Sequence, residues 1–133
     1  MTIELPRQSE ELERLMSNRR KVGPGEVIFL EGHVGDTAFI ILSGEVQVAV
    51  GTKQEDLVTI NNMMAGELFG EIALLRDDYK RSATTISKDG CELLVLEKAT
   101  FQKYMANADP FLRLVMDHLC KRILMWTDRV RVA

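Results

Sequence analysis

The chain has 133 residues, of which 46% are hydrophobic and 28% are charged, and its formal net charge is −3. This length suits one domain with one core, and the acidic balance excludes the broad basic surface that sequence-independent nucleic-acid binding requires. The charged N-terminus does not resemble a secretory signal, and no apolar run approaches the about 20 residues that cross a bilayer.

The first predicted element is an N-terminal helix over residues 9–21. Ser9 can cap this helix, and Glu10 and Glu11 fall in its first turn, where the helix dipole favours acidic side chains. The Gly-Pro-Gly run that follows Val22 is typical of a helix end.

Residues 22–97 are predicted to form a small all-β barrel or roll. Short β-type runs follow one another here, separated by Gly, Asp, Asn or Lys: GEVIFLEG, DTAFIILSG, EVQVAV, DLVTI, SATTI and CELLVLE. Gly44 and Gly66 lie where tight turns are expected. Val46, Val48 and Val50 alternate with smaller or polar residues, which indicates a strand with one face inside.

The last part of the chain, residues 98–130, is predicted to be helical. KATFQKYMAN forms a short segment, and Asp109 and Pro110 then provide an N-cap and a first helical residue for a long helix that ends near Arg129. The apolar face of this helix is too wide for full solvation, so it must lie on the roll, on another subunit, or on both. We therefore expect residues 1–133 to form a single, mainly β domain with flanking helices.

The stretch FGEIALLRDDYKRSATTI, residues 69–86, places Glu71 directly before the apolar run IALL and Arg81 directly before the uncharged run SATTI, and a charge in apolar surroundings is costly unless it is paired. A guanidinium can donate two charge-assisted hydrogen bonds to a phosphodiester, and a carboxylate can accept from a ribose hydroxyl. Gly70 leaves room for the backbone to approach. These groups fit a cyclic nucleotide, although Glu71 and Arg81 could equally be a structural ion pair that closes a hairpin.

FGEIALL followed by RSATT resembles the phosphate-binding cassette of the cyclic-nucleotide-binding domain family. GEVIFLEGHVGDTAFIILSGEVQV is similar to the first strands of that family, and the resemblance extends from about residue 12 to residue 130. It implies a β-roll of the double-stranded β-helix, jelly-roll-like type, with an N-terminal helix, a short cassette helix and a long C-terminal helix. It also implies that cAMP or cGMP is the ligand and that no cofactor is needed.

Carried over residue by residue, the resemblance implies that Glu71 binds the ribose 2′-hydroxyl and Arg81 the cyclic phosphate. The other cassette positions that match the ligand-binding pattern are Phe69, Gly70, Ile72, Ala73, Ser82 and Ala83. Lys80 departs from the proline of many members. In the family, threonine at the Ser82 position accompanies good cGMP binding and alanine accompanies cAMP preference, so serine favours cAMP only modestly.

The segment LCKRILMWTDRV, residues 119–130, is similar to the long helix of the catabolite activator proteins, which dimerises and covers the base. By this resemblance Arg122, Trp126 and Thr127 are candidates to cap the purine, although Trp126 is also interpretable as an ordinary core or interface aromatic. We expect a sensor whose ligand moves this helix, with a homodimer or an unidentified protein effector as its partner. No DNA-reading segment follows the helix, so we expect no nucleic-acid binding by this chain alone.

An enzyme is not expected. A cupin-type metal site needs several clustered histidines, whereas the chain has only His33 and His118, and no nucleophile motif or cysteine cluster is visible. Cys91 and Cys120 are read as reduced thiols of a cytoplasmic protein. The remaining alternative is a protein-interaction module that keeps the fold without binding nucleotide.

Overall fold

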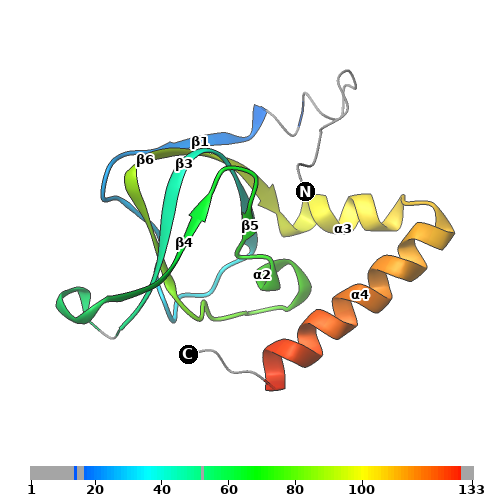
Figure 1. Cartoon of the computed structure of the whole chain (residues 1–133). Coiled ribbons are helices and arrows are strands. Elements are labelled where there is room, and N and C mark those ends of the chain that lie inside the picture. The colour runs from blue at the N-terminus through cyan, green and yellow to red at the C-terminus, as the bar shows by residue number, and fades with distance from the viewer. Residues whose placement is uncertain (1–13, 15–16, 52, 130–133) are drawn as a thin grey trace.

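The computed structural model describes residue 14, residues 17–51 and residues 53–129. Two long antiparallel strands, β3 (Thr37–Val50) and β6 (Thr84–Glu97), pair along most of their length and form the spine of a curled sheet. Two strands pair with β6 and two with β3: β1 (Arg19–Val22) and β2 (Val27–Phe29), then β4 (Val58–Met64) and β5 (Leu68–Phe69). Figure 1 shows that these strands curve into a roll, as the sequence predicted.

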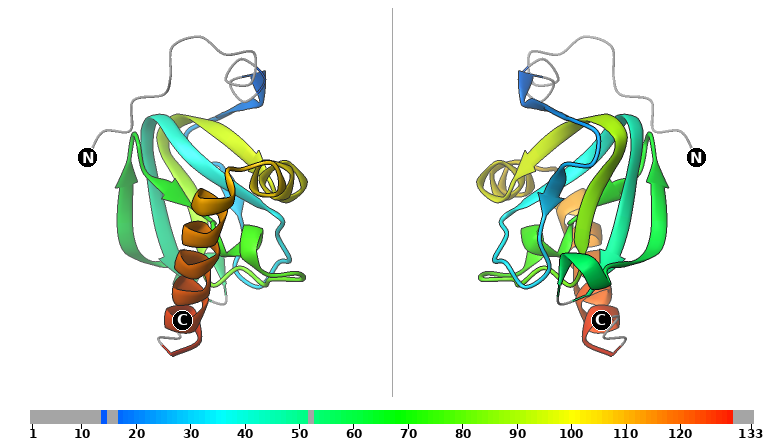
Figure 2. Two further views of the ribbon diagram at one scale, coloured as in Figure 1. Left: turned by 90° about the vertical axis from the view of Figure 1, so that its right-hand side faces the viewer. Right: turned by 90° about the vertical axis from the view of Figure 1, so that its left-hand side faces the viewer.

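The helices lie at one side of the roll (Figures 1 and 2). They are the short α2 (Ile72–Leu75), then α3 (Lys98–Ala106) and α4 (Pro110–Arg129). A separate 3₁₀ turn, η1 (Gln54–Asp56), lies between β3 and β4. Asp109 caps α4 as predicted, because its carboxylate Oδ1 accepts a 2.9 Å hydrogen bond from the Phe111 N–H. Within the described ranges, no helix combines the length and apolar character of a membrane span.

The core fills the inside of the roll. Three phenylalanine rings meet there: Phe39 lies 5.2 Å from Phe69, and Phe29 lies 5.9 Å from Phe69, between ring centroids. Ile41 and Leu93 are about 1% exposed or less, and burying each such side chain stabilises the fold by about 1.5–3 kcal/mol. The roll is therefore a packed body onto which a surface site can be built.

Gly66 and Gly44 have different roles. Gly66 lies in the predicted turn between β4 and β5, and its N–H donates to the Ile41 carbonyl at 2.7 Å. The prediction of a tight turn at Gly44 is wrong, because the residue lies inside β3 at a bulge with φ of 90°. A Cβ at Gly44 would come within 2.3 Å of the Gly90 carbonyl oxygen, so only glycine allows the two long strands to pair this closely at the bulge.

The alternation predicted for residues 46–50 holds only in its first half. Val46 is fully buried and Val48 packs against the core, but Ala49 is buried as well and Val50 is only half-exposed. β3 pairs with β6 without a register shift from Val46 to Ala49, so Ala49 is buried on the opposite face of the strand. The hydrophobic pattern alone did not reveal that both faces are covered at this point.

The predicted N-terminal helix falls largely outside the described residues, which leave out residues 1–13, 15 and 16. Arg14 and Ser17 have helical backbone, and the Ser17 hydroxyl donates to the Arg14 carbonyl at 2.6 Å. The helix does not reach Lys21 as predicted, because β1 begins at Arg19 and pairs with β6. Strand pairing overrides local helix preference here. The prediction of one domain over residues 1–133 stays a prediction.

Candidate functional site

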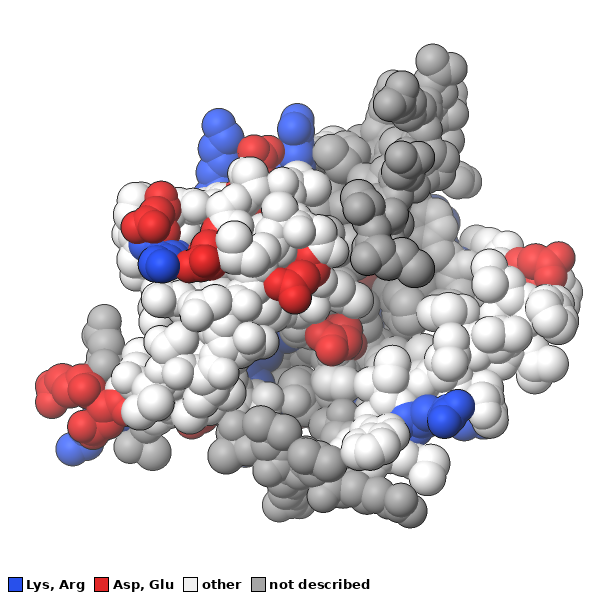
Figure 3. All heavy atoms as spheres, in the orientation of Figure 1, with Lys and Arg blue, Asp and Glu red and all other residues white. Residues whose placement is uncertain are grey.

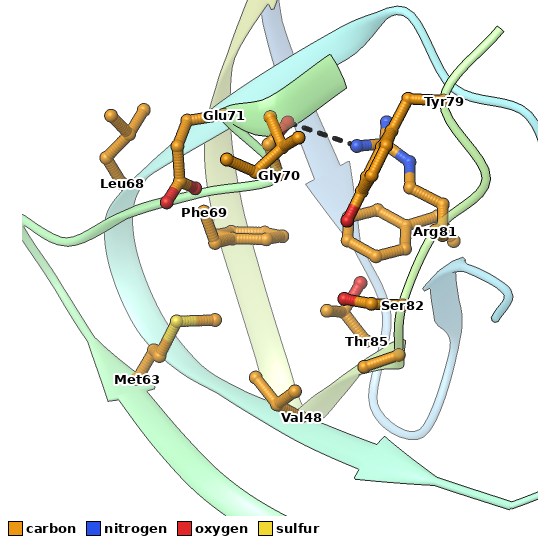
Figure 4. A pocket seen from close by; sticks show the side chains of 13 residues that line it. Val48, Met63, Leu68, Phe69, Gly70, Glu71, Tyr79, Arg81, Ser82 and Thr85 are labelled. Atoms are coloured by element: carbon orange, nitrogen blue, oxygen red, sulfur yellow. Dashed lines mark hydrogen bonds between the residues drawn. The ribbon is translucent and has the colours of Figure 1, made fainter. Parts of the chain in front are cut away.

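A cavity of about 220 Å³ opens on the roll beside α2, where the cassette faces strands β3, β4 and β6 (Figure 4). Backbone and side chains from distant parts of the sequence share its wall. The lining residues are Phe29, Val48, Met63, Leu68, Phe69, Gly70, Glu71, Ile72, Tyr79, Arg81, Ser82, Ala83 and Thr85. Arg81 and Gly70 lie at one end of this cavity, and Val48 and Met63 lie at the other (Figure 4).

The backbone of Arg81 is fixed by the segment that joins β2 to β3. The Arg81 N–H donates to the His33 carbonyl at 2.9 Å, and the Gly32 N–H donates to the Arg81 carbonyl at 2.8 Å. The Gly35 N–H also donates to the Tyr79 carbonyl at 3.0 Å. These hydrogen bonds hold the end of the cassette in register before β6 begins, so the direction of the arginine side chain is set by the fold.

Arg81 is a buried residue, with 4% of its surface exposed. Its Nη1 donates to the Gly70 carbonyl at 3.1 Å, and its Nη2 donates to the carbonyl of Thr37 at 2.7 Å and to the hydroxyl of Thr37 at 3.2 Å. Cζ lies 4.1 Å from the ring centroid of Phe29, a cation–π contact that offsets part of the desolvation cost. Nε is buried without a hydrogen-bond partner.

Burial lowers the pKa of the Arg81 guanidinium below its ordinary value, and the nearby Tyr79 and Asp36 oppose this shift. A guanidinium nevertheless keeps its proton at neutral pH. The side chain is therefore a desolvated positive charge at the wall of a cavity, held by neutral oxygens. Such a group is stabilised further by any anion that enters the cavity.

The alternative interpretation of Glu71 and Arg81 as a structural ion pair is wrong. Both residues are described, and no ion pair joins them; the nitrogens of Arg81 are directed to Gly70 and Thr37 instead. The Glu71 side chain is half-exposed and lines the same cavity. The two charges are therefore both available to the contents of the cavity.

The cassette turn that carries Glu71 is tightly closed. Gly70 has a φ of 75°, in the left-handed region, and its carbonyl accepts from the Ala73 N–H at 3.3 Å as well as from Arg81. The Glu71 carbonyl accepts from the Leu74 N–H at 3.0 Å. A Cβ at position 70 would lie 2.9 Å from Arg81 Nη1, so glycine is needed for both the turn and the approach of the arginine.

Gly35 is a residue of the site that the sequence did not reveal. A Cβ at this position would lie 2.2 Å from Nε and 2.3 Å from Cζ of Arg81, which leaves no space for any side chain. Thr37, which accepts from Nη2, was also missed. Both residues lie more than 40 positions before Arg81 in the chain, and the antiparallel bridge of Val34 with Lys80 helps to bring the two segments together.

Seven of the predicted ligand-binding residues share the cavity wall: Phe69, Gly70, Glu71, Ile72, Arg81, Ser82 and Ala83. Ala73 is fully buried behind the wall and does not line it. Phe29, Val48, Met63, Leu68, Tyr79 and Thr85 line the cavity without having been predicted. Ligand contact by any of these residues stays a prediction.

The predicted purine cap is not assembled in this structure. Arg122 and Trp126 lie on α4 with exposed side chains, Trp126 being 67% exposed, and neither lines the cavity. The side chain of Thr127 lies outside what the structure describes. Helix α4 contacts α2, but neither Arg122 nor Trp126 reaches the cavity wall, so a capping role requires this helix to move.

The histidines and cysteines lie apart from the cavity wall. His33 and His118 are exposed, and neither belongs to the residues that line the cavity. Cys91 and Cys120 are free thiols, as predicted, the first buried and the second partly buried. Burial, helped by Asp117, raises the pKa of the Cys120 thiol, which makes it a poor nucleophile.

Comparison with protein families supports the resemblance drawn from the sequence. The family described as the cyclic nucleotide-binding domain matches residues 19–108, which include the cassette and the whole roll. The chain belongs to this family. A cAMP-dependent protein kinase regulatory subunit of Yarrowia lipolytica is 34% identical over 98 residues, which cover 74% of this chain and 23% of the relative. The chain thus spans less than a quarter of that relative.

Solved structures share the fold. A half-site-occupied form of EAL enzyme Bd1971 is similar with a TM-score of 0.72 and 31% identity, covering 80% of this chain and 95% of that one. Forms of the same enzyme with cAMP bound and with cGMP bound give TM-scores of 0.61 and 0.63. The catabolite activator protein of Thermus thermophilus has a TM-score of 0.68 and 28% identity, covering 91% of this chain and 57% of that protein.

Proposed function

We propose that this domain binds cAMP or cGMP in the cavity and holds the cyclic phosphate with Arg81. The observation that carries the proposal is the state of Arg81: the residue is buried, its guanidinium has no carboxylate partner among the described residues, and it lines a cavity. A fold that desolvates a charge in this way favours an anionic ligand, and a phosphodiester can accept the parallel hydrogen bonds that a guanidinium offers.

The other groups of the cavity would serve the rest of the nucleotide. The Glu71 carboxylate would accept from the ribose 2′-hydroxyl, and the N–H groups of Glu71 and Ile72, at the start of α2, would approach the phosphate. The apolar end, with Val48 and Met63, would hold the flat base. Ser82 is exposed on the wall and favours cAMP only modestly, so the order of the two affinities is for the titration to decide.

We propose further that the domain is regulatory and not enzymatic, and that α4 is its output surface. The exposed face of this helix is rich in apolar side chains, and Figure 3 shows few charges over it. The exposed members are Phe111, Leu112, Leu114, Val115, Leu119, Ile123, Met125 and Trp126. Such a face suits a second copy of this chain or a protein effector in the cytoplasm.

The binding test is calorimetric titration of nucleotide-free protein with cAMP and then with cGMP, repeated with Arg81→Met. This substitution keeps the unbranched stem and removes the charge. We expect the affinity to fall about 10- to 150-fold, which corresponds to the loss of about 1.5–3 kcal/mol for a charged hydrogen bond.

The matched control is Lys80→Met, which makes the same change in net charge at an exposed neighbour outside the cavity. We expect it to change the affinity less than about threefold, because an exposed charge is screened by salt. Equal losses of affinity in Arg81→Met and Lys80→Met would show that Arg81 has no specific role in holding the phosphate. If the wild type gave no heat and no change in melting temperature with either nucleotide, the interaction module would be the better interpretation.

The output proposal is tested by amide hydrogen exchange. Closure of α4 over the nucleotide would slow the exchange of residues 110–129 when ligand is bound, because the helix would gain a partner. Identical exchange of this segment with and without nucleotide would contradict the proposed movement, and it would leave the binding proposal untouched.

A further inference from the structure

Thr85 presents an unpaired polar group at the cavity. The residue is 2% exposed, and its Oγ1 is buried without a hydrogen-bond partner. Thr85 nevertheless lines the cavity, and Figure 4 shows its side chain directed into the cavity, near that of Ser82. Buried hydroxyls in folded proteins are nearly always paired, so an unpaired one in the wall of a binding cavity points to a ligand group.

The preceding residue provides an internal comparison. Thr84 is equally buried at 2% exposure, but its Oγ1 accepts a 3.0 Å hydrogen bond from the Glu31 N–H, and it does not line the cavity. Successive residues of a strand point to opposite faces of the sheet. Of these two adjacent threonines in β6, one therefore has its hydroxyl used by the fold, and the other faces the cavity with its hydroxyl unused.

The strand register places Thr85 at the apolar end of the cavity. It pairs with Val48 of β3 on one side and with Phe29 of β2 on the other, and both of these residues line the cavity. Arg81, which would hold the phosphate, lies at the other end (Figure 4). The part of a bound nucleotide that reaches Thr85 is thus the end opposite the phosphate, which is the base.

We propose that Thr85 is a specificity-determining residue whose hydroxyl makes a hydrogen bond to a polar group of the purine base. The inference rests on the proposed nucleotide function and deepens it. A hydroxyl both donates and accepts, so it can pair with an exocyclic amino group, a carbonyl oxygen or a ring nitrogen. Adenine and guanine place these groups differently around the ring, so one hydroxyl at a fixed position distinguishes between them.

The test measures the ratio of cAMP affinity to cGMP affinity by calorimetry in the full chain, for the wild type, Thr85→Val and Thr85→Ser. Valine has the shape of threonine without the hydroxyl, whereas serine keeps the hydroxyl. We expect Thr85→Val to change the ratio by about three- to tenfold, the effect of one neutral hydrogen bond, and Thr85→Ser to keep the wild-type ratio. Thr85→Ala repeats the measurement should the valine variant fail to fold.

A second readout separates a ligand contact from a structural role. Without nucleotide, Thr85→Val should melt no lower than the wild type, because it removes a hydroxyl that has no partner. The control Thr84→Val should melt lower, because it leaves the Glu31 N–H unpaired, while the affinity ratio stays unchanged. We thus expect the affinity ratio to depend on the Thr85 hydroxyl and the melting temperature to depend on the Thr84 hydroxyl.

Two results would overturn the inference while the nucleotide function stands. An unchanged affinity ratio in Thr85→Val, with both affinities as in the wild type, would show that the hydroxyl does not meet the ligand. An equal loss for both nucleotides would place the contact on the ribose or phosphate and not on the base. Failure of the wild type to bind either nucleotide is a different outcome, because it would remove the proposed function itself.

Discussion

The wall of the cavity around Arg81 and the terminal helix α4 differ in how their side chains are held. At the wall, Phe69 is 4% exposed and stacks on Phe39, and Arg81 is fixed by three hydrogen bonds and a ring. On α4, Phe111 is 74% exposed and Trp126 is 67% exposed. The side chains of the cavity wall are thus packed within this chain, whereas large apolar side chains of α4 are exposed.

This difference teaches how a binding domain can divide its tasks. The region that would hold the phosphate is rigid because the core of the roll supports it, so it need not be rebuilt when ligand arrives. The helix has few contacts with the roll, and its position can change at little cost in packing. A response to ligand is therefore expected in α4 and not in the roll.

The largest effect that would test this contrast is expected from a pair of phenylalanine substitutions. Phe69→Ala should lower the free energy of unfolding by about 3–5 kcal/mol, because it leaves a cavity among three packed rings. Phe111→Ala, at an exposed position of α4, should change it by less than about 0.5 kcal/mol. Urea denaturation of the nucleotide-free protein measures both. Similar losses of unfolding free energy in the two variants would mean that Phe111 is packed and not exposed.

An intermediate effect is expected from Gly35→Ala. The new methyl group would overlap the guanidinium of Arg81, and such overpacking typically costs about 1–3 kcal/mol. Because Arg81 must move, we also expect at least about a tenfold loss of nucleotide affinity, measured by titration. Gly23→Ala is the control: a Cβ there meets only the flexible carboxylate of Glu26, so affinity should not change. Unaltered affinity in Gly35→Ala would show that phosphate binding does not depend on the space that Gly35 leaves for Arg81.

The smallest effect on stability is expected from Trp126→Ala. The exposed side chain should contribute less than about 0.5 kcal/mol to the free energy of unfolding. If α4 closes so that Trp126 stacks on the purine, the affinity for cAMP should nevertheless fall about fivefold or more, since stacking on a base contributes about 1–3 kcal/mol. Met125→Ala, at the neighbouring exposed position, is the control for titration. Equal affinities in both variants would assign Trp126 to an interface and not to a cap.

The sequence predicted the parts of the site that lie close together in the chain. Glu71 and Arg81 were found because each directly precedes an uncharged run, IALL and SATTI, and the glycine before Glu71 indicated a close approach of backbone. The resemblance to a family added the β-roll and the positions of the helices. Each of these signals is local, or is carried by a motif of a few residues.

The parts that were missed depend on strand register, which the sequence does not specify directly. Thr85 reaches the cavity because it pairs with Val48 of β3, which also lines the cavity. Gly35 meets Arg81 only after two distant segments have paired. Glycine is common in turns, yet the pairing of β3 with β6 places Gly44 at a bulge. Long-range pairing decided all three positions.

The depth of Arg81 also bears on how salt should affect binding. The guanidinium has already lost its water when the chain folds, so an arriving phosphodiester has to shed only its own hydration. Arg81 is a buried residue, and salt screens a buried pair of charges much less than an exposed pair. Attraction to this cavity should thus persist at ionic strengths that abolish binding to surface arginines, and the domain would report nucleotide concentration faithfully across a wide range of cellular salt.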